Sequence, residues 1–190
     1  SGKTETFLYP TLCGLIENSR RSHTSGIMKS MILYPMNALV TDQTTRLRKI
    51  LGSEPSQKQI SGILGRPLTF ANYTSATPYA GEFDRKKNRN LSRSMESLYC
   101  ISAVTSEEQR YHQRLIKQNR VPIKANIPDF VKSLANAKSI EQVDISHDTE
   151  LVLRQEVQSS PPDVLITNFS MLEYMLLRPI EHGIFDKTAQ

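Results

Sequence analysis

Two short apolar runs, each followed by polar residues and then by a helical pattern, most constrain how this chain can fold. Met31–Tyr34 ends at Pro35, and the run Asp163–Asn168 stands just before Ser170. Short, mostly apolar runs of this kind suit strands that are buried on both faces, as in a parallel sheet. A third strand is predicted at residues 68–74. Strands that alternate with helices indicate an α/β fold, with a parallel sheet flanked by helices.

The predicted helices come from apolar periodicity and from capping residues. Residues 4–17 should form a helix that Pro10 kinks, because proline lacks the N–H that continues the hydrogen-bond ladder. A second helix should begin at Asn37 as its N-cap and close at Gly52. Residues 53–67 are predicted to form a loop.

A further short helix is predicted at residues 151–157. Ser170 and Glu173 match a capping box, in which the serine side chain bonds forward and the glutamate side chain bonds back. The helix that they begin should end near Pro179.

Between residues 79 and 147 the pattern changes. Residues 84–90 form a basic, polar run, and the segments around it are only weakly amphipathic. We interpret 79–147 as an insertion, partly helical or disordered, that divides the α/β domain into residues 1–78 and 148–190. Its basic residues could follow a phosphate backbone or form a solvated, mobile loop. They are Arg85, Lys86, Lys87, Arg89 and Arg93.

The amino-acid composition excludes only some classes of protein. Lys plus Arg number 24 against 19 Asp plus Glu, and this mild basic excess suits nucleic acid but also many ordinary proteins. Two cysteines and four scattered histidines give no disulfide framework and no metal-ligand spacing. We therefore expect a cytoplasmic protein. No apolar run approaches the roughly 20 residues of a membrane span, so no membrane partner is expected.

The first four residues, Ser-Gly-Lys-Thr, could be the second half of a phosphate-binding loop. In such a loop, backbone N–H groups converge on a phosphate, a lysine reaches the β/γ oxygens and a hydroxyl ligates Mg²⁺. The full pattern needs another glycine five residues before Gly2, so the tetrapeptide alone is also compatible with chance. The chain has no initiator methionine, and we expect it to be an excised piece.

Polar side chains follow all three predicted strands. They would form a ledge of short donors along one edge of the sheet, which suits a sugar-phosphate backbone. Ordinary turn chemistry would place the same residue types there. These residues are Pro35 and Asn37, Thr74 and Thr77, and Thr167 and Asn168.

In this order, the segments SGKTETFLYPTL, ILYPMNALVTDQTTRLRKIL, NYTSATP and PPDVLITNFSMLEYMLLRP resemble the first RecA-like domain of a superfamily 2 DEAD/DEAH-box helicase. They correspond to motif I, motif Ia, motif Ib and the stretch just before the acidic motif II. The resemblance covers residues 1–78 and about 150–186. It implies a partial RecA-like sheet in a nucleic-acid helicase or translocase that hydrolyses ATP with Mg²⁺, with DNA favoured over RNA.

The resemblance also implies roles for single residues. Lys3 would contact the β/γ-phosphates and Thr4 would ligate Mg²⁺ as the catalytic pair, while Ser1, Gly2 and Glu5 would complete the ATP site. Nucleic acid would be contacted by Pro35, Met36, Asn37, Gln43, Arg46, Thr74, Thr77, Thr167 and Asn168. A glycine usual in motif Ib is replaced by Ser75, which puts that backbone contact in doubt.

The chain carries no Asp-Glu-x-His motif, and Ile184 lies about where the acidic strand should begin. Phosphoryl transfer needs that carboxylate and a cation on the γ-phosphate, so we expect the piece to be inactive alone and to need the second RecA-like domain of its parent. Two alternatives stay open. They are a non-catalytic nucleic-acid-binding α/β module and another phosphate-loop NTPase.

Overall fold

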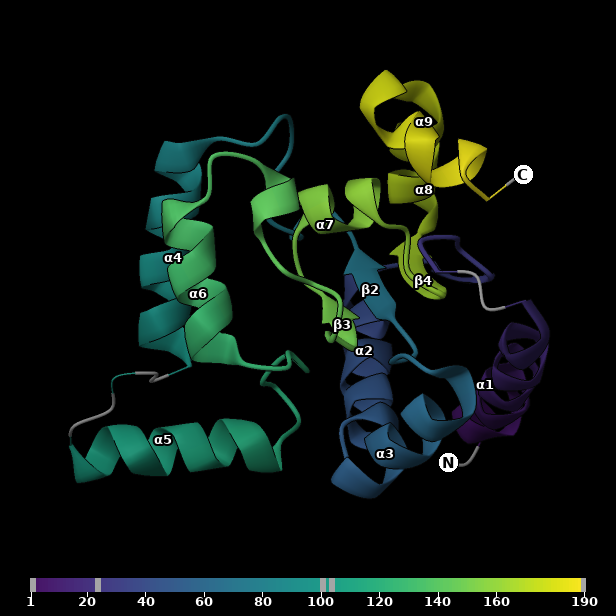
Figure 1. The fold of residues 1–190 in the computed structure, drawn as a ribbon, viewed down its shortest axis with the longest axis horizontal. Helices are drawn as coiled ribbons and strands as arrows, with labels where there is room; N and C mark the ends of the chain where they lie inside the picture. The colour runs from purple at the N-terminus through teal and green to yellow at the C-terminus, as the bar shows by residue number, and fades with distance from the viewer. Residues whose placement is uncertain (1–2, 23–24, 100–101, 103–104, 189–190) are drawn as a thin grey trace.

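Four parallel strands form the sheet at the centre of the fold (Figure 1). In the computed structural model, which describes residues 3–22, 25–99, 102 and 105–188, the strands lie in the order β1-β4-β2-β3. They are β1 (Ser30–Tyr34), β2 (Phe70–Tyr73), β3 (Glu150–Leu151) and β4 (Val164–Asn168). The predicted α/β class, with a parallel sheet flanked by helices, is confirmed, and the sheet is consistent with a partial RecA-like fold.

Helices cover both faces of the sheet. On one face, α1 (Lys3–Ser22), α2 (Asn37–Leu51) and α3 (Glu54–Leu64) pack on Phe70, Val164 and Ile166. On the other face, α7 (Arg154–Ser159), α8 (Phe169–Leu177) and α9 (Pro179–Asp186) pack on Ala71, Tyr73 and Leu165. Side chains alternate between the faces of a strand, so β4 serves both cores and is buried throughout.

The segment 79–147 forms a helical unit with a small core of its own. It contains α4 (Arg85–Leu98), α5 (Ser106–Lys117), α6 (Ile127–Asn136) and the 3₁₀ turn η1 (Ile140–Gln142). Figure 1 shows α4 and α6 side by side, and Met95, Phe130 and Leu134 are buried between them. Leu153 joins this cluster from the α/β part, so the inserted helices are attached to the sheet through apolar contacts.

The amino ends of three strands are held together by Asp163. Its carboxylate accepts two hydrogen bonds from Arg66, both at 2.7 Å, and one from the Thr69 backbone N–H at 2.9 Å, and Lys29 Nζ lies 3.2 Å away. Burial alone would raise the pKa of Asp163, but the hydrogen bonds and the charges of Arg66 and Lys29 together lower it. The carboxylate is therefore held ionised between the strands.

Strand β1 lies at an edge of the sheet. It pairs with β4 and with no other strand of the described residues, and all five of its residues are partly exposed. The sequence Ser-Met-Ile-Leu-Tyr is apolar enough for a central strand, and an apolar edge strand can pair with another chain.

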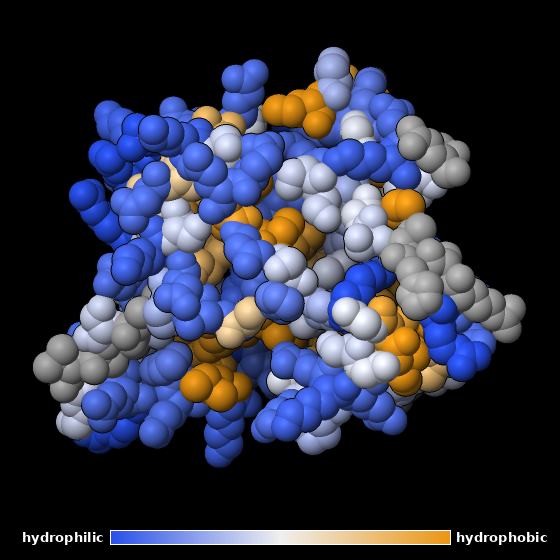
Figure 2. All heavy atoms as spheres, in the orientation of Figure 1, coloured by the Kyte–Doolittle hydropathy of each residue, from blue (hydrophilic) through white to orange (hydrophobic). Residues whose placement is uncertain are grey.

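Apolar side chains are also exposed on α8 and α9, in the upper part of Figure 2. Leu176 and Leu177 are 57% and 71% exposed, and Ile180 is 40% exposed. None of the helices in the described part of the chain has the length and apolar character that a membrane crossing needs.

Two predicted helix starts are wrong. Helix α2 has Met36, not Asn37, as its N-cap, and α8 has Asn168 as its N-cap, two residues before the predicted Ser170. The Asn168 side chain accepts from Met171 N at 2.7 Å, which fills the role assigned to the serine. The amide of Asn37 instead bonds to neighbouring strand ends.

Other element predictions also need correction. Residues 53–67 are not a loop, because α3 begins at the N-cap Ser53 and ends at Gly65 in the left-handed conformation (φ +71°). The predicted helix at 151–157 is the end of β3 followed by α7. Ile184, where a strand was expected to begin, lies within helix α9, which begins at Pro179. Helix α1 runs to Ser22, five residues beyond the predicted end.

Candidate functional site

Three polar side chains meet at the carboxyl ends of three adjacent strands. Asn37 follows β1, Ser75 follows β2 and Asn168 ends β4. Asn168 Nδ2 donates a short hydrogen bond to Asn37 Oδ1, and Asn37 Nδ2 donates to Ser75 Oγ at 3.2 Å. The sequence placed two of these residues at the sheet edge, and the structure joins all three into one cluster, hereafter the strand-end cluster.

The loop that carries Ser75 is fixed by buried threonines. Thr77 Oγ1 accepts from Thr74 N at 2.8 Å and donates to the Asn72 carbonyl at 3.1 Å. Thr74 and Thr77 are 4% and 5% exposed, so their hydroxyls serve the loop itself, while Ser75 remains exposed. Arg154 supports the loop from beneath, because its guanidinium donates to the Thr77 and Thr74 carbonyls at 3.0 and 2.9 Å.

Thr167 is equally internal. It is fully buried, and its hydroxyl donates to the Tyr73 carbonyl at 2.6 Å, which ties the end of β4 to the end of β2. Asn168 is 7% exposed and both caps α8 and holds the amide of Asn37. The two residues thus fix the relative position of two of the strand ends.

A cavity of about 380 Å³ opens over the strand-end cluster. Its lining combines amide and hydroxyl groups with apolar side chains, and both Met36 and Tyr174 are more than half exposed. The lining residues are Pro35, Met36, Asn37, Ser75, Asn168, Ser170, Met171 and Tyr174. The N-cap Met36 supplies no side-chain acceptor to the first turn of α2, which begins at Asn37 on the wall of this cavity.

The cavity offers donors to an anion. Asn37 already donates into the Ser75 oxygen, so the serine hydroxyl can turn its own hydrogen outward. Short donors of this kind are what a phosphate oxygen requires, and Ser75 lies beside Asn37 at the start of α2.

Gln43 and Arg46 lie elsewhere on α2. Gln43 is 4% exposed, and its Oε1 has no hydrogen-bond partner in the part of the chain that the structure describes. Arg46 pairs with Asp42 at 2.9 Å and with Glu5 at 2.6 Å. The hydrogen bond to Asp42 raises the pKa of Arg46. The structure does not bring either residue into the strand-end cluster.

Most of the predicted ATP site falls outside what the structure describes. Ser1 and Gly2 lie outside the described residues, as does the side chain of Lys3, whereas Thr4 and Glu5 are partly exposed. Glu5 contacts Arg46, which lies nine residues beyond Asn37 and hence about 14 Å along the axis of α2. Helix α1 near Glu5 is therefore not joined to the strand-end cluster, and α1 packs against α3 (Figure 1).

The described residues supply part of what a triphosphate with Mg²⁺ needs. Thr4 offers one hydroxyl, and the Glu5 carboxylate is engaged by Arg46. No group of three or more His, Cys, Asp or Glu side chains within the described ranges could hold a metal ion.

Several residues of the candidate site were not predicted from the sequence. Arg154 reads as a surface charge on a short helix, and nothing in its neighbourhood marks it as a buried support for a loop that lies about 80 positions earlier. Ser170 was assigned to helix capping and Tyr174 was given no role, although their place after a predicted strand end was a usable signal.

Comparison with known proteins gives a similarity along the entire chain. The chain is 32% identical over 210 aligned residues to Druantia protein DruE of Escherichia coli (strain UMEA 4076-1). The similarity covers 100% of this chain but 11% of that protein, so the chain spans a small part of the relative's length. No protein-family model matches the chain, and no solved structure does.

Proposed function

We propose that this chain is the nucleic-acid- and ATP-binding part of a larger ATP-dependent helicase or translocase. The observation that carries the proposal is the strand-end cluster, in which Asn37, Ser75 and Asn168 meet at the carboxyl ends of three parallel strands. Ligands of open α/β sheets bind at such ends. The helicase-like order of motifs and the similarity to one part of Druantia protein DruE along the whole chain support it further.

A single nucleic-acid strand, DNA rather than RNA, lies across the cluster in this proposal. Ser75 and the first turn of α2 donate to a backbone phosphate, and Pro35 and Met36 flank the strand. Contacts of this kind position a backbone and carry no sequence information. Thr74, Thr77 and Thr167 act as positioning residues, because their hydroxyls are buried and bonded within the chain.

The ATP site is proposed on the resemblance of the Ser-Gly-Lys-Thr segment. Lys3 would meet the β/γ-phosphates and Thr4 would ligate Mg²⁺, with Ser1, Gly2 and Glu5 around them. Hydrolysis also needs a carboxylate for the metal and a cation on the γ-phosphate. We propose that the second RecA-like domain of the larger protein supplies the cation, and that the 190 residues alone do not hydrolyse ATP.

A second candidate function is a nucleic-acid-binding module without ATP hydrolysis. The separation between the start of α1 and the strand-end cluster favours it, because the two sites of a working motor should adjoin. The two functions share the strand-end cluster and differ in the role of Lys3.

ATPase assays of the full-length protein, with and without single-stranded DNA, separate these functions. We expect Lys3→Ala to abolish hydrolysis and Ser75→Glu to abolish its stimulation by DNA while basal hydrolysis remains. Gln59→Glu adds the same charge on an exposed position of α3 and should change neither. Hydrolysis that survives Lys3→Ala would refute the ATP site. Absence of hydrolysis in the wild type, with DNA binding retained, would establish the second candidate.

A further inference from the structure

Three cavities adjoin along the side of α2. Asn37 lines both the strand-end cavity and a second cavity of about 270 Å³. The second cavity shares Thr41, Asn72 and Tyr99 with a third of about 940 Å³, which extends along α2 to Arg120. These neighbouring cavities, which share lining residues from the strand ends to the helices of segment 79–147, are hereafter called the α2 groove.

The far wall of the α2 groove is fixed by Arg48. From α2 its guanidinium bonds both carboxylate oxygens of Glu150, at 2.8 and 2.6 Å, and the Arg120 carbonyl at 2.9 Å. Glu150 also accepts from Ile123 N at 3.0 Å. Asn119, which follows the C-cap of α5 and lies in the left-handed region (φ +54°), turns the chain toward Arg48. The loop after α5 is thus held against α2 by a bidentate ion pair.

The charge along the groove is positive. The two carboxylates on its lining, Asp42 and Glu150, are paired with Arg46 and Arg48. Lys117 and Arg120 also line it and are exposed, and no ion pair joins either of them to an acidic side chain among residues 3–22, 25–99, 102 and 105–188. A polyanion is the ligand that fits this excess of positive charge.

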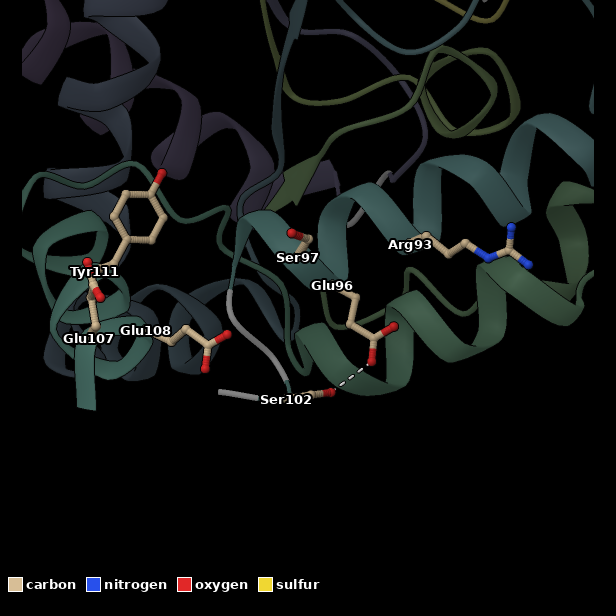
Figure 3. Close-up of a pocket in the computed structure, with 7 residues that line it drawn as sticks. All are labelled: Arg93, Glu96, Ser97, Ser102, Glu107, Glu108 and Tyr111. Carbon is tan, nitrogen blue, oxygen red and sulfur yellow. Dashed lines mark hydrogen bonds between the residues drawn. The ribbon is translucent and has the colours of Figure 1, made fainter. Parts of the chain in front are cut away.

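Apolar and aromatic side chains accompany these cations. Leu98 and Tyr111 line the groove and are 48% and 40% exposed. On its other side, Tyr111 borders a separate cavity lined by Glu96, Glu107 and Glu108. Figure 3 shows the hydroxyl end of Tyr111 pointing away from Glu96 and Glu108. The acidic cavity repels a phosphate backbone, so the groove side of Tyr111 is the side on which a base can stack.

We propose that the inserted helices form the second wall of a binding groove for single-stranded nucleic acid, continuous with the strand-end cluster. Tyr111 stacks on a base, and Lys117 and Arg120 meet backbone phosphates. The proposal rests on the proposed function, since it extends the same strand along α2. It gives the segment 79–147 a task that the helicase resemblance does not cover.

The test measures binding of fluorescent oligo(dT) to the full-length protein at several salt concentrations. Each phosphate contact on a single strand contributes about 0.7 to the slope of log affinity against log salt. Lys117→Gln/Arg120→Gln should therefore reduce the slope by about 1.4. Lys132→Gln/Lys138→Gln removes the same charge from exposed positions of the same segment and should leave the slope unchanged.

Tyr111→Ala should weaken binding by roughly tenfold, and Tyr111→Phe, which keeps the ring, should bind like the wild type. A wild-type slope in the Lys117/Arg120 variant together with wild-type affinity in Tyr111→Ala would overturn this inference and leave the proposed function intact. Failure of the wild type to bind oligo(dT) at any salt concentration would overturn both.

Discussion

Asn37 links the ends of three strands through side-chain hydrogen bonds. Its amide accepts from Asn168 and donates to Ser75, although the sequence assigned it only a capping role and a nucleic-acid contact. An amide is needed here because it is both a donor and an acceptor. A carboxylate of the same shape could keep the bond from Asn168 but could not donate to Ser75.

Asn37→Asp should therefore weaken DNA binding with little effect on stability. The new charge faces the proposed phosphate position, and Ser75 loses a donor; we expect affinity for single-stranded DNA to fall at least tenfold, or about 1.4 kcal/mol. Fluorescence anisotropy of the full-length protein measures this. Asp42→Asn, which removes a carboxylate further along α2, serves as a control and should not weaken binding. Unchanged affinity in Asn37→Asp would remove the cluster from the contact surface.

Asp163 governs stability rather than binding. Asp163→Asn leaves Arg66 and Lys29 without their carboxylate, and breaking a buried pair of this kind costs about 3 kcal/mol. Hydrogen exchange of the β4 amides in the full-length protein should show this loss, whereas the exposed Asp186→Asn should show none.

The same carboxylate sets a pH dependence of stability. Because the folded-state pKa of Asp163 is lowered, its contribution is fully present above the unfolded value of about 3.9 and is lost as pH falls through the folded value. Protection of the β4 amides should fall in that acidic range in the wild type. In Asp163→Asn this part of the pH response should be missing, and an identical pH response in both proteins would contradict the assignment.

At the scale of elements, the sequence predicted the strands and helices whose apolar residues recur regularly over several positions. Strands β1, β2 and β4 and helix α2 fall close to their expected positions, because buried parallel strands and an amphipathic helix leave clear periodicity. Helix α3 was missed although Ser53 and Gly65 mark both its ends, because its apolar face is only Ile60, Ile63 and Leu64.

Strand β3 could not have been predicted from local pattern. It has two residues, and the first is Glu150, a charged residue that is 2% exposed. It lies in the sheet because Arg48, about 100 positions earlier, neutralises it. Part of the strand-end cluster could be predicted, because the carboxyl ends of parallel strands all lie at one edge of the sheet. The same arrangement brings its side chains together. Its hydrogen bonds, and the role of Ser75, depend on loop geometry that no local pattern encodes.

Helix α8 exposes an apolar surface that should affect solution behaviour. Leu177 is 71% exposed on a helix that is apolar almost all round, a composition typical of helices that are covered by other structure. Leu177→Lys should reduce self-association of the 190-residue chain without lowering its thermal stability. Light scattering against concentration measures this, and Lys187→Arg is a neutral control. Equal scattering from both variants would show that this surface does not drive association.

At the scale of the whole molecule, β1 forms an edge of the sheet in the part of the chain that the structure describes. Its five residues are partly exposed, while those of β4 are buried. We expect the isolated 190-residue chain to be marginally stable and prone to aggregation, because an unpaired apolar edge can pair with other chains. Calorimetry should show a weak or broad transition. A cooperative transition well above room temperature would contradict this expectation.

Photocrosslinking of a single strand carrying 4-thiothymine to the full-length protein tests the central claim most directly, because it reports where the strand lies. We expect crosslinked peptides to contain Met36, Ser75 or Tyr174, and Ser75→Glu to suppress them while Gln59→Glu does not. Crosslinks confined to other parts of the protein, with none at the strand-end cluster, would contradict the account.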